Sequence, residues 1–149
     1  MYRGKRLVSL AVAILVIVGM VSCVPQVRDL PTAEAEAVRS QTDGVVENVF
    51  AGLESGDYAA FSQDFDGKMK EALNEAKFAE TRSQLEGRIG RYQARTFAKA
   101  QETQGYITLI YDARFEHEEH VTVRVVLRRE DGRWLVSGLW FDSPKLRAK

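Results

Sequence analysis

The spacing of apolar residues changes at Gly90, and this change limits the folds open to the chain. Before Gly90, from about residue 32, apolar residues recur every three or four positions, as on one side of an α-helix. After it, apolar and polar residues alternate over 93–101, 106–115, 121–129 and 134–141, which predicts four β-strands. We therefore expect an α+β fold, with N-terminal helices packed on a curved, mainly four-stranded antiparallel sheet.

Turn residues predict the register of the last hairpins. Asp131 and Gly132 suit a two-residue turn. With this turn, the expected pairs are Leu127 with Val136, Val125 with Gly138, and Val123 with Trp140. A loop with an odd number of residues, three to five within 116–120, would keep the apolar residues of the preceding strand on the same face of the sheet. It would place Phe115 opposite Val121. The other face would then carry Asp112 across from Arg124, together with Ile110, Val126, Leu139 and Phe141.

Short polar residues predict where the helices begin. The first helix is expected from residue 32 to Ser55 and Gly56. Asp57, Asp66 and Asn74 stand at N-cap positions, where a side-chain oxygen accepts the free amide hydrogens of the first turn. The helix after Asn74 is expected to run to about residue 86 and to end at Gly87.

The N-terminus has the pattern of an export signal. Basic residues in the first six positions precede a charge-free run, 7–21, of about fifteen residues, whereas a membrane span needs about twenty. Ser22 and Cys23 then resemble a bacterial lipobox, in which the cysteine is lipidated, although Met20 departs from its usual Leu, Val or Ile. We expect a signal peptide over 1–22, a lipidated cysteine and tether over 23–31, and one domain over 32–149. The alternative is an uncleaved anchor helix with an inert cysteine.

Both alternatives place the domain at the cell membrane, on the extracytoplasmic side, because the basic residues hold the N-terminus inside. In the lipidated form, acyl chains such as palmitate on Cys23 would provide the anchor. From Cys23 onward the chain has 18 basic and 21 acidic residues, a net charge of −3. This balance argues against a nucleic-acid partner, which would need a clustered basic face.

Two sequence motifs carry a family resemblance. The segments SGDYAAFSQDFDGKMKEAL and VSGLWFDSPKL resemble the prokaryotic family called domain of unknown function 3887, over about 45–147. The resemblance implies a cystatin-like fold similar to nuclear transport factor 2, in which a sheet wraps a long N-terminal helix. It implies little about function, because that fold hosts isomerases, dehydratases, ligand carriers and proteins without catalysis.

Three carboxylates between the expected helices are the first candidates for chemistry. Asp57, Asp64 and Asp66 cluster there, and paired carboxylates can act as general acid and base. The cap positions account for Asp57 and Asp66. Asp64 and Tyr58 are thus the weak candidates for a catalytic acid or base, and a solvated loop carboxylate is the alternative for Asp64.

The segment HEEH holds both histidines, His117 and His120. The alternating flanks predict a hairpin loop, and the spacing lacks the i, i+4 pair of a zinc-protease helix, so we expect a solvated acidic loop and no metal site. No glycine-rich phosphate motif follows a predicted strand, and no Ser-His-Asp or Cys-His arrangement is credible. The sequence therefore predicts no cofactor.

A cavity between sheet and helices is the default ligand site of such a fold. Tyr58, Tyr111, Trp134 and Trp140 are candidates to line it for a small apolar ligand; the alternative is that they fill the core. We expect a small-ligand-binding or protein-interaction module at the cell envelope, with a homodimer through the mixed sheet face as one partner mode. An isomerase or dehydratase using the cavity, and a structural envelope protein without ligand, are the alternatives.

Overall fold

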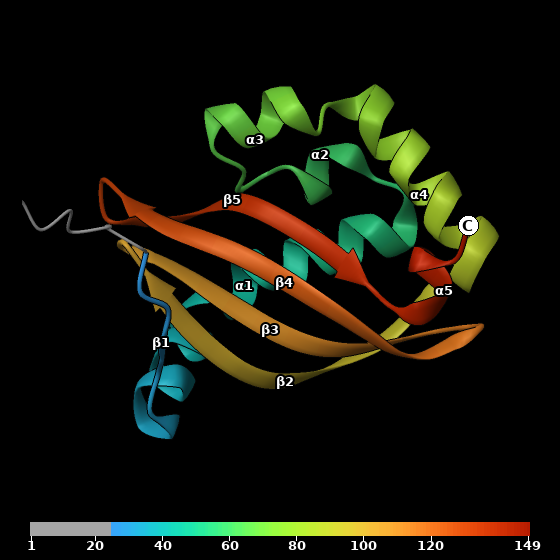
Figure 1. Cartoon of the computed structure of the whole chain (residues 1–149). Helices are drawn as coiled ribbons and strands as arrows, with labels where there is room; N and C mark the ends of the chain where they lie inside the picture. Colours follow the sequence, from blue (N-terminus) through green and yellow to red (C-terminus); the bar gives the residue numbers. More distant parts are fainter. Residues whose placement is uncertain (1–24) are drawn as a thin grey trace, which may run out of the picture.

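A five-stranded antiparallel sheet in the order β1-β2-β3-β4-β5 forms one layer of the molecule (Figure 1). The computed structural model describes residues 25–149, so the predicted signal peptide and Cys23 lie outside the described residues. The strands are β1 Arg28–Asp29, β2 Tyr92–Thr103, β3 Tyr106–Phe115, β4 Glu118–Glu130 and β5 Arg133–Asp142. The predicted α+β class is confirmed. The sheet has one strand more than expected, because β1, within the predicted tether, pairs with β2.

The helices precede the sheet, apart from one short turn at the C-terminus. They are α1 Thr32–Ser55, α2 Tyr58–Phe61, α3 Gly67–Ala72, α4 Glu75–Ile89 and α5 Pro144–Arg147. The three predicted N-caps are confirmed: Asp57 accepts from the amide of Ala59, Asp66 from that of Met69, and Asn74 from that of Lys77. Local sequence therefore determines where α2, α3 and α4 begin.

The predicted end of α4 at Gly87 is wrong. The helix continues to Ile89, which is fully buried, and ends at Gly90. Gly90 has a φ of 81°, a conformation that glycine adopts without steric cost, whereas Gly87 lies inside the helix. Burial of Ile89 stabilises the last turn, so the helix continues past Gly87, although glycine inside a helix is less favourable than alanine by about 1 kcal/mol.

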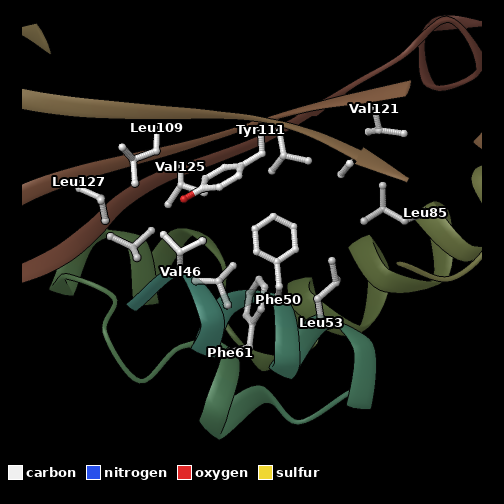
Figure 2. Close-up of a cluster of buried hydrophobic side chains, with 14 of the residues drawn as sticks. Val46, Phe50, Leu53, Phe61, Leu85, Leu109, Tyr111, Val121, Val125 and Leu127 are labelled. Carbon is white, nitrogen blue, oxygen red and sulfur yellow. The ribbon is translucent and has the colours of Figure 1, made fainter. Parts of the chain in front are cut away.

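The hydrophobic core lies between α1 and one face of the sheet, which we call the inner face (Figure 2). From α1, Val46, Val49 and Phe50 are at most 1% exposed. Val46 and Phe50 face the sheet, where Leu109 and Leu127 are fully buried. Gly52 lets α2 approach α1 closely, because a Cβ atom there would collide with the backbone of Phe61. The opposite side of the sheet, the outer face, has no helix in front of it in Figure 1, where α1 lies behind the strands.

The predicted register of the last hairpin holds only near its turn. Asp131 and Gly132 form the turn with positive φ, and Leu127 pairs with Val136 as expected. Beyond this pair, Ser137 is an extra residue in β5, and the register shifts by one. The observed pairs are Val126 with Gly138, Val125 with Leu139, Arg124 with Trp140, and Val123 with Phe141. Leu139 and Phe141 therefore pack toward the core, and Trp140 lies on the outer face.

The loop between β3 and β4 also differs from the prediction. It is a two-residue turn at Glu116 and His117 rather than a loop of three to five residues. An extra residue in β4, between the pairs Ala113–Val121 and Phe115–Glu118, compensates for the short turn and keeps the apolar residues on the inner face. Asp112 lies opposite Thr122, so the expected Asp112–Arg124 pair is wrong.

Candidate functional site

A buried carboxylate, Asp66, links the helical layer to the bulge in β5. Besides capping α3, its Oδ2 accepts hydrogen bonds from Ser137 Oγ at 2.7 Å and from Arg128 Nε at 3.0 Å. The neighbouring backbone also pairs with β5, because the Asp66 amide donates to the Val136 carbonyl and the Val136 amide donates to the Asp64 carbonyl. Asp66 thus holds in place the extra residue that turns Trp140 outward.

Hydrogen bonding decides the charge state of Asp66. Burial acts to raise its pKa, since the side chain is 6% exposed. The hydrogen bonds from the Met69 amide, Ser137 and Arg128 outweigh burial and hold the pKa below its usual range. A carboxylate held ionised with these partners is a structural anchor, and its oxygens are already engaged.

The interior beside α1 is filled by side chains. Tyr111 is 3% exposed and packs against Phe50 and Phe97, with ring centroids at 6.0 and 5.7 Å. The Arg95 guanidinium lies 4.5 Å from the Phe50 ring centroid and donates to Glu47 at 2.8 Å and to the Tyr92 hydroxyl at 3.2 Å. Tyr111 is thus a core residue, as the alternative interpretation holds.

The hydroxyl of Tyr111 has no hydrogen-bond partner, although it is buried (Figure 2). Burial raises the pKa of this phenol to about 12. Leaving a hydroxyl unpaired in the core costs free energy, which phenylalanine at this position would avoid.

Tyr58 lies away from Tyr111, in a surface hollow of about 250 Å³ between α2 and α4. Its hydroxyl donates to the Leu73 carbonyl at 3.1 Å, and its ring centroid lies 5.7 Å from that of Phe78. Asp64, the other candidate acid or base, is 13% exposed and accepts a hydrogen bond from Asn48 at 2.8 Å. Both groups have structural partners, and Asp64 is not the solvated loop carboxylate considered as its alternative.

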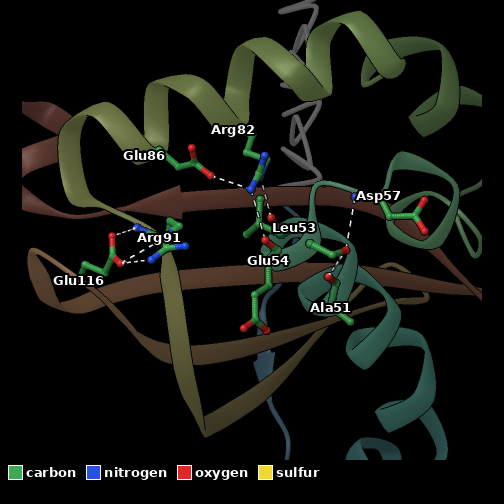
Figure 3. A network of polar contacts seen from close by, with 9 residues as sticks. Ala51, Leu53, Glu54, Asp57, Arg82, Glu86, Arg91 and Glu116 are labelled. Atoms are coloured by element: carbon green, nitrogen blue, oxygen red, sulfur yellow. Dashed lines mark hydrogen bonds and ion pairs between the residues drawn. The ribbon is translucent and has the colours of Figure 1, made fainter.

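The charged groups beside the Tyr58 hollow hold helix ends together (Figure 3). Arg82 donates to the carbonyls of Leu53 and Glu54 at 3.0 and 3.3 Å, and it pairs with Glu86 at 2.9 Å. These carbonyls belong to the last turn of α1, where intrahelical donors are lacking. Nearby, Arg91 and Glu116 pair at 3.0 Å and join the start of β2 to the β3–β4 turn. The network is structural.

The two histidines do not form a metal site in the described part of the chain. No group of three or more His, Cys, Asp or Glu side chains suited to a metal occurs among residues 25–149. His120 Nδ1 lies 3.0 Å from Asp112 Oδ2. The hydrogen bond with Asp112 raises the pKa of His120 above its usual value.

The tryptophans lie on different faces of β5. Trp134 is half-buried, and the Arg129 guanidinium lies 5.6 Å from its ring centroid. Trp140 is 56% exposed on the outer face, and its six-membered ring covers Gly138, where a Cβ atom would collide with it. The four predicted pocket residues are therefore not brought together, and Trp140 does not line the interior.

The outer face combines exposed aromatic and basic side chains. By register it carries Lys99, Tyr106, Thr108, Ile110, Asp112, Arg114, Thr122, Arg124, Val126, Gly138, Trp140 and Asp142. Two of its carboxylates have partners, Asp112 with His120 and Asp142 with Arg147, the latter at 2.7 Å, whereas Glu119 lines a hollow with Arg114 and Asp112. Arg114 and Arg124 are exposed and have no ion-pair partner within 4.0 Å in the described residues. The alternation of side chains along the strands places both arginines on this face. Their lack of ion-pair partners depends on the observed register.

The chain matches a known family. The family model described as "Protein of unknown function (DUF3887)" matches residues 46–132, which is more than half of the chain. The matched region contains the first predicted motif, and the motif around Trp140 follows it. Neither the curated proteins nor the solved structures gave a match. Separately, none of the helices in residues 25–149 is long and apolar enough to cross a membrane.

Proposed function

The chain belongs to the DUF3887 family of proteins of unknown function, and from this premise we propose that it is a membrane-anchored extracytoplasmic lipoprotein. The observation that carries the proposal is the order of the first 23 residues: basic residues, a charge-free apolar run, then Ser22 and Cys23. Two acyl groups on the modified cysteine suffice for stable attachment, whereas a single chain gives only reversible binding.

Acyl labelling of the full chain tests this proposal. Cells that process lipoproteins are fed a fatty acid carrying a chemical tag, and tag incorporation and membrane fractionation are measured. Wild type is expected to be tagged, and Cys23→Ser to lose the tag and the membrane association. A variant combining Cys23→Ser with Ser40→Cys controls for thiol acylation elsewhere, because Ser40 is exposed on α1. A tag that persists in Cys23→Ser would contradict the proposal.

The domain acts as an interaction module, and the outer face is the surface on which it acts. The supporting observation is that Trp140 and Tyr106, 56% and 42% exposed, lie on a face that no helix covers. Tyr and Trp are enriched at interfaces, because they combine a large apolar ring with a polar tip. From the sequence, a second copy of the chain is the partner expected for this face, and the membrane is expected as a partner through the anchor at Cys23.

One surface hollow supports binding of a small apolar ligand as a second function. It lies between α4, β5 and α5 and has a volume of about 460 Å³. It is lined by the apolar residues Leu85, Phe141 and Leu146 and by the polar residues Thr81, Gln84 and Arg88. Native mass spectrometry of the full chain released from detergent is expected to show an added mass that is lost on denaturation. Leu146→Trp, which fills the hollow, should abolish the added mass, whereas Val27→Trp, at an exposed site outside it, should retain it.

A further inference from the structure

The exposed aromatic residues of the outer face are of the kind found at membrane interfaces. Trp and Tyr combine an apolar body with a polar tip and are enriched at the level of the lipid headgroups. Trp140 is on β5 and Tyr106 begins β3, and the half-buried side chains of Ile110 and Val126 lie between them by register. Ile110 and Val126 are the apolar part of this region, which also contains Thr108 and Arg124.

Two of the charged groups on the outer face without an ion-pair partner in the described part of the chain are arginines, and Glu119, which lines a hollow with Arg114, is a negative one. Arg124 lies directly opposite Trp140 on the neighbouring strand, and Arg114 lies on β3. Asp142 is paired with Arg147 and Asp112 is hydrogen-bonded to His120, whereas the guanidinium groups of Arg124 and Arg114 have no carboxylate within 4.0 Å in the described residues and are available to an external anion. Guanidinium groups bind phosphate in a bidentate manner, and acidic headgroups attract basic residues near the membrane surface.

The length of chain before β1 keeps the domain close to the membrane. Cys23 and Arg28, the first residue of β1, are five residues apart, so at full extension their Cα atoms are separated by no more than about 18 Å. β1 lies at one edge of the same sheet. A tether this short allows the outer face to lie along the bilayer but not to move far from it.

From these observations we propose that the outer face rests on the membrane surface, with Trp140 and Tyr106 at headgroup depth and Arg124 and Arg114 on acidic lipid phosphates. The proposal rests on the proposed lipid anchor at Cys23. It names the membrane itself as the partner of the interaction surface. The anchor provides attachment, and the outer face determines how the domain is oriented.

Tryptophan fluorescence in vesicles of known composition tests the proposal. The full lipidated chain is placed in phosphatidylcholine vesicles containing phosphatidylglycerol, with or without brominated acyl chains, which quench nearby indoles. Trp134→Phe leaves Trp140 as the one tryptophan of the chain, and Trp140→Phe leaves Trp134. Emission of Trp140 is expected to fall by about half or more in brominated vesicles, and that of Trp134 to change much less. Arg124→Gln should reduce the quenching when phosphatidylglycerol is present.

Vesicle flotation separates failure of this inference from failure of the anchor. A protein that floats with the vesicles but shows no lipid quenching of Trp140 would overturn the orientation and leave the anchor intact. Shielding of Trp140 from aqueous iodide without lipid quenching would also overturn it, in favour of a second copy on this face. A protein that neither floats nor carries acyl chains would overturn both. If Trp134→Phe fails to fold, the difference in quenching between wild type and Trp140→Phe gives the contribution of Trp140.

Discussion

The hydroxyl of Ser137 donates a 2.7 Å hydrogen bond to the carboxylate of Asp66, across 71 positions of sequence. Ser137 is the extra residue in β5, so this contact joins the cap of α3 to the irregularity that places Trp140 on the outer face. A helix start in the first half of the chain thereby influences which side chains the last strand exposes.

Asp66→Ala is expected to destabilise the protein by about 2–4 kcal/mol, because it removes a cap and the acceptor of the Ser137 hydroxyl and of Arg128 Nε. Asp66→Asn, which retains capping, should cost less. Glu130→Ala is the control: Glu130 also pairs with Arg128 but is 46% exposed, so its loss should cost less than about 1 kcal/mol. Urea unfolding measures all three, and equal costs for Asp66→Ala and Glu130→Ala would contradict the anchoring role.

Two glycines of α1 should respond differently to alanine. At Gly44 a Cβ atom meets nothing within 4 Å, so Gly44→Ala should stabilise the exposed helix by about 0.5–1 kcal/mol. At Gly52 the added atom collides with the Phe61 backbone, so Gly52→Ala must displace α2 and should destabilise by about 1–3 kcal/mol. Thermal unfolding of both variants checks the signs, and stabilisation by Gly52→Ala would contradict the observed contact between α1 and α2.

Tyr111→Phe should be neutral or stabilising by about 1 kcal/mol, because it removes a buried hydroxyl that has no partner. Tyr58→Phe is the matched comparison and should destabilise by about 1 kcal/mol, since its hydroxyl donates to the Leu73 carbonyl. Denaturant titrations at neutral pH give both values. A clear loss of stability in Tyr111→Phe would reveal a partner for the phenol.

The raised pKa of the Tyr111 phenol predicts that the free energy of unfolding falls at alkaline pH. Its pKa is raised from 10.0 to about 12 in the folded protein, so the stability associated with the neutral phenol is fully present below pH 10. That stability is lost as the pH rises from 10 to about 12. Unfolding free energies across this range should fall more steeply for wild type than for Tyr111→Phe, and parallel curves would be inconsistent with a phenol ionising in the core.

The His120 imidazole should titrate above its ordinary pKa of 6.5, because Asp112 stabilises the charged form. The stabilising contribution of this pair is fully present below pH 6.5 and is lost as the pH rises through the higher pKa. Nuclear magnetic resonance of the imidazole protons measures the midpoint. Asp112→Asn should lower it, whereas Asp131→Asn, in the other hairpin, should leave it unchanged.

The sequence alone determined the features that depend on neighbouring residues. The caps Asp57, Asp66 and Asn74 and the turn at Asp131 and Gly132 each act within a few positions of the chain. The change of apolar period at Gly90 likewise separates helices from strands, because a single buried face imposes one spacing on a helix and another on a strand. These features suffice for the α+β class and for most element boundaries.

Tertiary structure decided the features that need a distant partner. Ser137 is an extra residue in β5, and its hydroxyl is stabilised there by donating a hydrogen bond to Asp66. No local sequence pattern encodes that contact. Since side chains alternate along a strand, this one residue moves Trp140 from the expected interior to the outer face and brings Phe141 inward. Burial of Ile89 likewise carried α4 past Gly87. The candidate surface, with Trp140 beside Arg124, was therefore set by packing between segments far apart in the chain.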